Sequence, residues 1–482
     1  MGTINHGVKT SETSTSMASV IESGNCAVII GTAPVNLAKS PKINTPVLCY
    51  SEKEAIEAFG YSDDWASYTL CEAIDVFFRL FKVGPVVFIN VLDPATHKEA
   101  VADTAITFTK KKGTITDKGI LLPSLALKQS DDTVVPKDKY TAVFNEDGSV
   151  SIIIIDETLA GTLTTGKVSY DKLKPSLVTE TDIIGGIDTA TLKTEGIALI
   201  NQVFPKYNKV PNIGLAPGWT DKSKVMTSLV SAMKSINEVF TGIALADIDS
   251  TTIDKYNKVP AWKNDNSYIH ENLYNFWPMG LIDKTLYHIS TLVAASIYAV
   301  DAKNGDIPYE SPSNKPLNLT GICLKNKTEV DLLLTQADYL NDNGVATVIN
   351  FTNGWRLWGN RTGCYPANRD IKDNTISCKR MFIWDNNNFT LTYWLDVDKP
   401  ANNKLMDKIV DSYNDYYNGL VTTGAILGGR IEFNKQDNPT TKLMDGKYKF
   451  KRYMTPVGVA EKIESDLEYD TEYLKNLFGG GN

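Results

Sequence analysis

The stretch Cys26-Ala27-Val28-Ile29-Ile30-Gly31 decides the fold class of the first half of the chain. It is a short apolar run, rich in β-branched residues, that ends at a glycine, which is typical of a buried strand. Residues 86–92 form a second run of this kind, and residues 65–81 between them carry apolar side chains at helical spacing. The order strand, helix, strand predicts a βαβ unit with parallel strands.

The same α/β texture continues outward from this unit. Ser51 and Glu54 have the spacing of a capping box before a short helix that ends at Gly60. Later patterns predict helices at 192–204, 222–240 and 286–302, and strands at 212–216 and 242–246. The last third predicts helices at 329–341 and 403–417, strands at 345–351, 379–384 and 389–395, and a hairpin of 430–434 with 447–454.

Residues 93–180 differ because short alternating runs are separated by turn residues and helical periodicity is missing. We therefore expect an α/β and α+β multidomain protein: an α/β core with an inserted all-β domain and a C-terminal assembly domain with extended terminal arms. The expected division is an N-terminal arm (1–20), a discontinuous α/β domain (21–92 and 181–318), an inserted surface β domain (93–180), an assembly domain (319–455) and a C-terminal arm (456–482).

Composition excludes several classes of protein. The net charge of −8 over 482 residues gives no basic face for nucleic acid. No apolar run is long enough to insert in a membrane, and the Ser/Thr-rich start lacks the features of a signal peptide, so we expect a soluble cytoplasmic product. The six cysteines contain no CxxC pair, which fits free thiols.

The search for catalytic chemistry finds no site. The phosphate-loop, GxSxG, HExxH and GxGxxG motifs are missing, and the four histidines lie in separate segments. The acidic strings at 247–249 and 396–398 are expected to be structural. Arg356, Arg361 and Arg369 favour pairing with carboxylates over an anion site. We predict no catalytic, cofactor-binding or metal-binding residue.

The tail carries a different signal. Apolar Ile463, Leu467 and Tyr469 alternate with acidic Glu464, Asp466 and Glu468, which predicts a strand with one acidic face. Before it, Lys447, Lys449 and Lys451 alternate with aromatic residues and predict a basic strand. Opposite charges stabilise neighbouring strands. The two segments therefore pair either within one subunit or between neighbouring copies, as in strand addition.

One further stretch carries a family resemblance. Gly354-Trp355-Arg356-Leu357-Trp358-Gly359-Asn360-Arg361-Thr362 is similar to the G-x-R-x-W-G-x-R-T stretch of the sheath proteins of contractile phage tails and related injection particles, including bacteriocin-like ones. The opening βαβ unit, residues 380–384 with the following helix, and the C-terminal hairpin and tail also resemble this family. The loop after 286–302 departs from it because the A-P-A-N ending of many members is replaced by Ser311-Pro312-Ser313-Asn314.

The resemblance implies a structural subunit and not an enzyme. It implies stacked six-fold rings around a tail tube, terminal arms that add strands to neighbouring subunits, and contraction that drives the tube through a target envelope. The implied partners are copies of the chain itself, the tube protein, and baseplate and terminator proteins, without nucleic acid or membrane insertion. The implied location is a phage tail or phage-like particle assembled in the bacterial cytoplasm. Two alternatives stay open: a non-contractile shell or lattice protein, and an α/β enzyme that binds a phosphorylated ligand.

Overall fold

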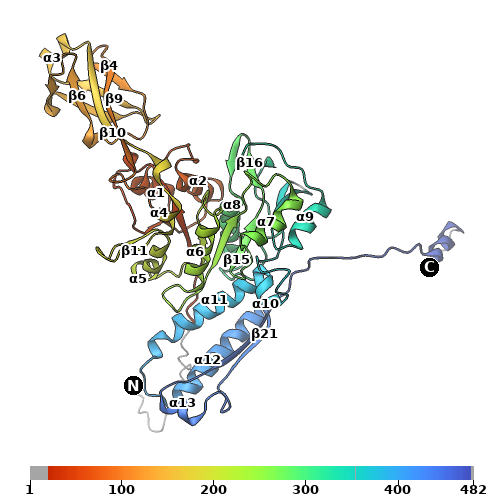
Figure 1. Ribbon diagram of the computed structural model, residues 1–482. Coiled ribbons are helices and arrows are strands. Elements are labelled where there is room, and N and C mark those ends of the chain that lie inside the picture. Colours follow the sequence, from red (N-terminus) through yellow and green to blue (C-terminus); the bar gives the residue numbers. More distant parts are fainter. Residues whose placement is uncertain (1–19, 353, 479–482) are drawn as a thin grey trace, which may run out of the picture.

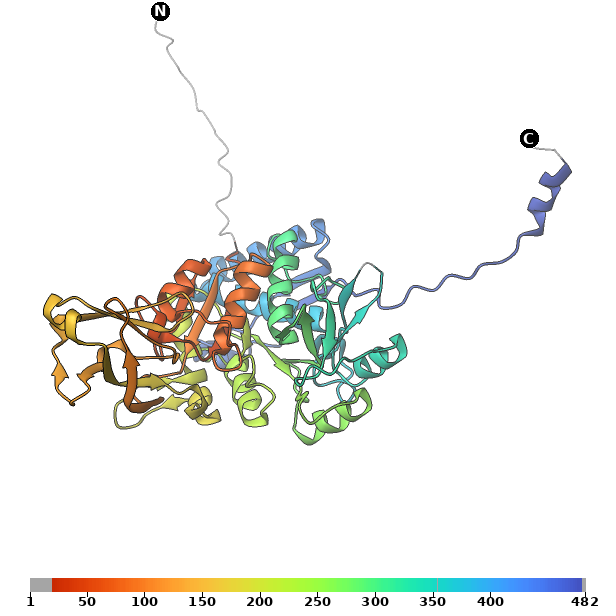
Figure 2. The same ribbon diagram turned by 90° about the horizontal axis from the view of Figure 1, so that it is seen from above.

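The computed structural model describes residues 20–352 and 354–478. Figure 1 shows a β-rich part at one end, an α/β part in the middle, and a layer of long helices beyond it. The C-terminal segment stands away from all three parts in both Figure 1 and Figure 2. The fold is thus mixed α/β, with several separate sheets.

A six-stranded sheet forms the centre of the α/β part, in the order β15-β14-β13-β1-β3-β2. Its strands are β1 (Ala27–Gly31), β2 (Val47–Cys49), β3 (Val86–Asn90), β13 (Ile213–Leu215), β14 (Ile243–Asp247) and β15 (Leu273–Phe276). β1 pairs in parallel with β3, with Val28 opposite Val87, so the predicted βαβ unit is confirmed. Only the edge strand β2 runs antiparallel to its neighbour in this sheet.

Helices cover both faces of this sheet. One layer contains α1 (Glu52–Phe59), α2 (Thr69–Ile74), the π-helix η2 (Asp75–Leu80) and α8 (Ile289–Lys303); the other contains α4 (Glu180–Ile184), α5 (Val203–Tyr207), α6 (Ser223–Lys234) and the 3-10 helix η6 (Gly196–Gln202). Ala27 and Ile29 of β1 pack against the first layer, and Val28 and Ile30 against the second. Burial on both faces explains why the strand is a continuous apolar run.

The helix expected over 192–204 is wrong in its first half. Leu192 and Gly196 have positive φ, and the short strand β12 (Thr194–Glu195) pairs with β11 (Gly186–Ile187). Positive φ interrupts an α-helix, so the regular turns start later, at η6 and α5. The apolar spacing in this segment therefore reflects one buried face of a 3-10 helix.

The β-rich part has two sheets around its own apolar core. One has the order β4-β10-β6-β7 and the other β5-β9-β8. The elements are β4 (Lys98–Thr107), β5 (Lys112–Ile115), β6 (Ala126–Gln129), β7 (Val134–Val135), β8 (Tyr140–Phe144), β9 (Val150–Ile154), β10 (Thr165–Leu173) and α3 (Glu157–Thr162).

Small sheets and the long helices make up the C-terminal part. The remaining strands are β16 (Met279–Ile282), β17 (Thr285–Tyr287), β18 (Gly321–Cys323), β19 (Thr347–Asn350), β20 (Trp355–Trp358), β21 (Ile426–Glu432) and β22 (Lys451–Pro456). The remaining helices are α7 (Val259–Asp265), α9 (Leu334–Asn341), α10 (Ile371–Asn374), α11 (Ile376–Tyr393), α12 (Asn403–Thr422) and α13 (Thr440–Met444). The helix predicted at 403–417 is confirmed and extends to Thr422.

The two strands expected at 379–384 and 389–395 are wrong, because α11 is one continuous helix across both. The polar run 385–388 resembles a turn in the sequence but lies in the middle of this helix. Asp385, Asn387 and Asn388 are buried there. A helix that buries polar side chains lacks the apolar stripe by which helices are predicted.

The tail also differs from the expectation. β21 and β22 form an antiparallel hairpin, but of the three lysines only Lys451 lies in a strand. Residues 457–470 contain no strand in the described chain, and the 3-10 helix η9 (Thr471–Phe478) follows. An extended segment becomes a strand only when a neighbouring strand accepts its backbone hydrogen bonds. Among residues 20–352 and 354–478, no strand pairs with the acidic segment.

Candidate assembly site

α11 joins the C-terminal helices to the α/β part. Arg380 is buried on α11 and forms an ion pair with Asp301 of α8, which is fully buried. The side chain of Asn387 accepts a hydrogen bond from the backbone NH of Thr241 (3.1 Å) and donates one to its carbonyl (2.8 Å). Breaking a buried ion pair by removing one partner costs about 3–5 kcal/mol. These contacts therefore fix the position of α11 on the α/β part.

A second ion pair, between a buried aspartate and a partly buried arginine, connects α11 to β22 beside α12. Arg452 of β22 pairs with the carboxylate of Asp385. Tyr413 and Tyr417 of α12 donate hydrogen bonds to the same carboxylate, at 2.8 and 3.2 Å. Burial raises the pKa of both tyrosines, so their hydroxyls stay protonated and act as donors. The hairpin is thus held by a satisfied polar network as well as by apolar packing.

The first described residues run along α11. Asn388 accepts hydrogen bonds from the backbone NH (2.7 Å) and hydroxyl (2.9 Å) of Ser23. Tyr416 donates to Glu22 at 3.1 Å, and Val20 packs on the core between α11 and α12. The expected N-terminal arm, residues 1–20, lies outside the described residues except for Val20. The chain therefore enters the fold beside the C-terminal helices.

The motif stretch forms β20 and the turn after it, in an antiparallel pair with β19. Trp358 donates to Asp338 of α9 (2.9 Å), and Arg356 donates to the carbonyl of Asn314 (2.8 Å). Thr362 is fully buried and donates to the carbonyl of Asp373 (2.7 Å). The motif residues therefore join several segments.

The two glycines of the motif adopt positive φ, Gly354 at 109° and Gly359 at 143°. A Cβ at Gly359 would lie 2.9 Å from the Cα of Ala346, so only glycine fits that close approach.

Arg361 connects the motif to the C-terminal arm, which we define as residues 457–478 of the described chain. Its guanidinium donates to the carboxylate of Glu461 at 2.6 Å. It also donates to Thr375 (3.1 Å) and lies over the ring of Tyr365, 5.1 Å from the centroid. The expectation that the arginines pair with carboxylates holds for Arg361.

The expected receiving lysines lie at and before β22. Lys449 pairs with Asp437 at 3.2 Å, and Lys447 with Asp445 at 3.5 Å. Lys451 begins β22, and its ammonium lies over the ring of Tyr453. Because Lys447 and Lys449 precede the strand, the structure brings the three lysines to one end of the hairpin and not onto one continuous strand face.

Among the described residues, the expected arm residues make no hydrogen bond or ion pair with the body of the chain. Ile463, Leu467 and Tyr469 are 87%, 99% and 74% exposed. Glu464, Asp466 and Glu468 are exposed as well. Of the contacts formed by residues 20–352 and 354–478, the Arg361–Glu461 pair is the only hydrogen bond or ion pair that joins the arm to the rest of the chain.

A buried charged cluster occupies the place where doubly wound sheets bind ligands, at the carboxyl ends of the strands. His288 Nδ1 lies 2.6 Å from Glu72, and Ser290 donates from its backbone NH to Asp247 at 3.0 Å. Burial disfavours the charged imidazole, but Glu72 and Asp247 together raise the pKa of His288 to about 9. The cavity beside them measures about 20 Å³, which is room for about one water. This cluster thus fills the crevice.

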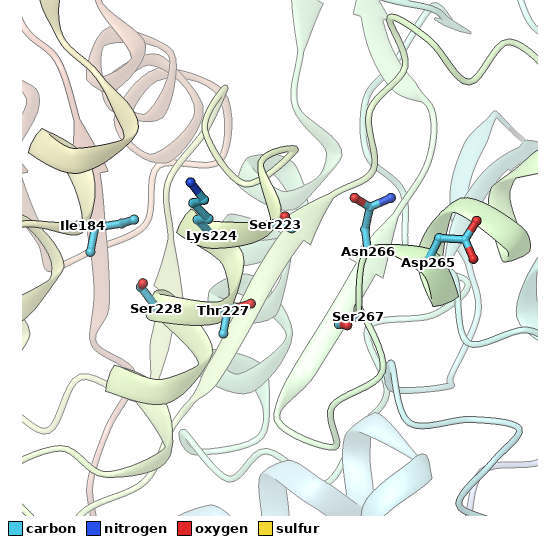
Figure 3. A pocket seen from close by; sticks show the side chains of 8 residues that line it. All are labelled: Ile184, Ser223, Lys224, Thr227, Ser228, Asp265, Asn266 and Ser267. Carbon is cyan, nitrogen blue, oxygen red and sulfur yellow. The ribbon is translucent and has the colours of Figure 1, made fainter.

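A wider hollow of about 530 Å³ lies between the start of α6 and the end of α7 (Figure 3). Its lining is Ile184, Ser223, Lys224, Thr227, Ser228, Asp265, Asn266 and Ser267. In the described ranges, no group of three or more His, Cys, Asp or Glu side chains is arranged to hold a metal ion. Among the helices of the described chain, none is long and apolar enough to cross a membrane.

Sequence reasoning missed the buried network of α11. The available signal was the run of one aspartate and three asparagines at 385–388 inside an otherwise apolar stretch. Such a run in a buried helix points to tertiary hydrogen bonds, because buried polar groups need partners.

Comparison with known proteins identifies consistent relatives. No protein-family model matches the chain. The tail sheath protein of Burkholderia phage BcepMu is 28% identical over 503 aligned residues, covering 98% of each chain. The tail sheath protein of Escherichia phage P2 is 26% identical over 55% of this chain and 65% of its own length.

Among solved structures, the sheath of the extracellular contractile injection system PVC in its contracted state superimposes with a TM-score of 0.57 and 14% identity, over 98% of this chain and 99% of that one. This likeness shows a shared fold. The chain therefore has the fold of a contractile sheath subunit, and it is similar over nearly its whole length to the tail sheath protein of phage BcepMu.

Proposed function

We propose that this chain is the structural subunit of a contractile tail sheath. In this proposal copies stack as six-fold rings around a tail tube, bind baseplate and terminator proteins at the ends, and contract to drive the tube through a cell envelope. The supporting relative is the tail sheath protein of Burkholderia phage BcepMu, which matches over 98% of this chain. The observation that carries the proposal is the C-terminal arm, whose Ile463, Leu467 and Tyr469 are 87%, 99% and 74% exposed in the described part of the chain.

The arm needs a partner to become ordered. Fixing about 20 residues costs roughly 20 kcal/mol in backbone entropy. Burying on the order of 800 Å² of apolar surface at ~25 cal/mol/Å² offsets this entropy cost. Backbone hydrogen bonds to a partner strand provide further stabilisation. A second copy of the chain supplies both if the arm adds a strand to its hairpin.

The hairpin is suited to receive a strand. β21 and β22 form a two-stranded sheet, so each has one unpaired edge among the described residues. Arg452 and Ile431 face the helices. The outer face carries the basic residues Arg430 and Lys451 together with Tyr453 and with Glu432, which pairs with Arg430 at 2.6 Å. An added arm would place Ile463, Leu467 and Tyr469 toward the helices and Glu464, Asp466 and Glu468 beside the basic outer face. Charge and burial are then complementary on both faces.

The rest of the chain takes roles by the same proposal. Residues 21–92 with 181–318 form the α/β domain, 93–180 an outward-facing β domain, and 319–455 the assembly domain between the arms (1–20 and 456–482). The assembled sheath is a kinetic trap released by rigid-body repacking of subunits, with the arms keeping neighbours connected. Its location is a phage tail or phage-like particle assembled in the bacterial host.

The direct test is truncation after Val457. We expect the full-length chain to form long hollow cylinders in electron microscopy and the truncated chain to stay a folded monomer by circular dichroism and sedimentation. Flat or spherical lattices of the full-length chain would favour the shell alternative. Tubes formed by the truncated chain would overturn strand addition by the arm.

A charge-reversal pair tests the complementarity. Changing Lys447, Lys449 and Lys451 to glutamate should abolish assembly, and changing Glu464, Asp466 and Glu468 to lysine in the same chain should restore it. If the variant with Lys447, Lys449 and Lys451 changed to glutamate assembles normally by itself, the basic end of the hairpin does not receive the arm.

A further inference from the structure

Within residues 20–352 and 354–478, one ion pair joins the root of the C-terminal arm to the body. β22 ends at Pro456, and the NH of Glu461 donates to the carbonyl of Val459 (3.0 Å), which turns the chain. The carboxylate of Glu461 then accepts the 2.6 Å bond from Arg361. From Glu461 to Leu477 every residue is exposed. The direction in which the arm leaves the body is therefore determined at Glu461.

Arg361 is itself held in place from several sides. Its backbone forms an antiparallel bridge with Thr375, and its guanidinium donates to the Thr375 hydroxyl (3.1 Å). The ring of Tyr365 covers one face of the guanidinium. The next residue, Thr362, is fully buried with its NH bonded to the carbonyl of Asn374 (2.8 Å). Arg361 thus presents a charge of fixed position to the arm.

We infer that Arg361 is a positioning residue for assembly: its ion pair with Glu461, the arm-root pair, fixes the exit direction of the arm so that it points at a neighbouring copy. This inference rests on the proposed function. Holding a segment in its bound direction raises its effective concentration at the partner without adding a contact there. The pair is partly exposed, with side chains 24% and 39% accessible, so its effect is on orientation more than on stability.

The arm direction is measurable in the monomer. Cysteines introduced by Asp342→Cys on the body and Ser465→Cys on the arm would carry spin labels, because both positions are exposed. The six native cysteines are buried, and burial raises the pKa of several, Cys26 and Cys71 to about 12, so they react slowly. The label-to-label distance distribution then reports the exit direction.

The variants are Arg361→Gln, Glu461→Gln and the swap R361E/E461R, with Lys462→Gln as the matched control. Lys462 is adjacent to Glu461, and its one ion pair in the described chain is with Glu464 of the arm. We expect Arg361→Gln and Glu461→Gln each to broaden the label-to-label distance distribution at low salt. The swap should narrow this distribution again, and the control should have the same distribution as the unmodified chain. Equal widths for all variants, or broadening by the control, would overturn the inference.

Assembly kinetics provide the second measurement. We expect Arg361→Gln and Glu461→Gln to slow tube formation about twofold to fivefold, the ratio that one partly exposed ion pair produces, while the melting temperature of the monomer stays unchanged. An unchanged rate would overturn the positioning role. If the unmodified chain forms no tubes, the proposed function fails, whereas the distance distributions of the monomer still test the arm-root pair.

Discussion

The C-terminal hairpin and the arm that follows it have similar sequences and opposite environments. Lysines alternate with aromatic residues at 447–451, and charged residues alternate with apolar or aromatic ones at 462–470, apart from Ser465. In the hairpin, β22 pairs with β21 and buries Arg452 against Asp385. In the arm, Leu467 is 99% exposed and no strand forms. Of the alternating lysines, too, only Lys451 lies in a strand. An alternating pattern therefore becomes a strand only where a partner strand accepts its backbone hydrogen bonds.

The largest expected effect is in the hairpin network. Asp385→Ala should lower the free energy of unfolding by about 3–5 kcal/mol, because it leaves Arg452 and two tyrosine hydroxyls without their shared acceptor. Urea unfolding of the chain truncated after Val457 measures this without interference from assembly. Glu464→Ala in the full-length monomer is the matched arm variant and should change the free energy by under about 0.5 kcal/mol. Similar losses from both variants would contradict the comparison.

We expect the stability of the chain to depend on pH through a residue of the body, His288, and not through the arm. The folded pKa of His288 is about 9, above the ordinary value of about 6.5 expected in the unfolded chain. The contribution of protonated His288 to the free energy of unfolding, on the order of 3 kcal/mol, is therefore complete below pH 6.5 and is lost as the pH rises through 9.

The measurement is unfolding at pH 6.5 and pH 9 for the unmodified chain and for His288→Gln, each with and without the arm. Burial lowers the pKa of Lys263 to about 8, which makes stability rise above that pH in every variant. The contribution of Lys263 cancels when the free energy of unfolding of His288→Gln is subtracted from that of the unmodified chain. If this difference in the free energy of unfolding does not decrease between pH 6.5 and pH 9, His288 is not held protonated in the folded chain.

A pair of glycines compares packing in the two regions. A Cβ at Gly429 of β21 would lie 2.8 Å from the Tyr417 ring, whereas a Cβ at Gly458 in the arm would meet no atom within 4 Å. Gly429→Ala should therefore cost about 1–3 kcal/mol through overpacking, and Gly458→Ala almost nothing. Thermal unfolding of the two variants separates them. Equal melting temperatures would mean that the hairpin is not packed tightly on α12.

Removal of the whole arm should also have only a small effect on the stability of the monomer. Truncation after Val457 should change the free energy of unfolding of the monomer by less than about 1 kcal/mol, because it removes exposed residues and one partly exposed ion pair. Urea titration monitored by tryptophan fluorescence tests this. A larger loss would show that the arm also packs on its own subunit.

The sequence predicted the core better than the connections between its parts. Apolar runs at β1, β3, β13 and β14 locate the parallel sheet, since strands buried on both faces are recognisable without a partner. The motif stretch was found in the sequence, but its contacts with Asp338, Asp373 and Glu461 were not. These contacts join residues as many as 100 positions apart, and local patterns carry no information about such pairs.

By itself the sequence determined the α/β core, the lack of recognisable catalytic motifs, and the alternating acidic tail. Tertiary structure alone decided that residues 376–393 form one helix, because Asp385, Asn387 and Asn388 find buried partners on other segments. It also decided that the lysines gather at one end of the hairpin and that Glu461 meets Arg361. The physical reason is the same in each case: a polar group or an extended backbone takes the conformation that its partner permits.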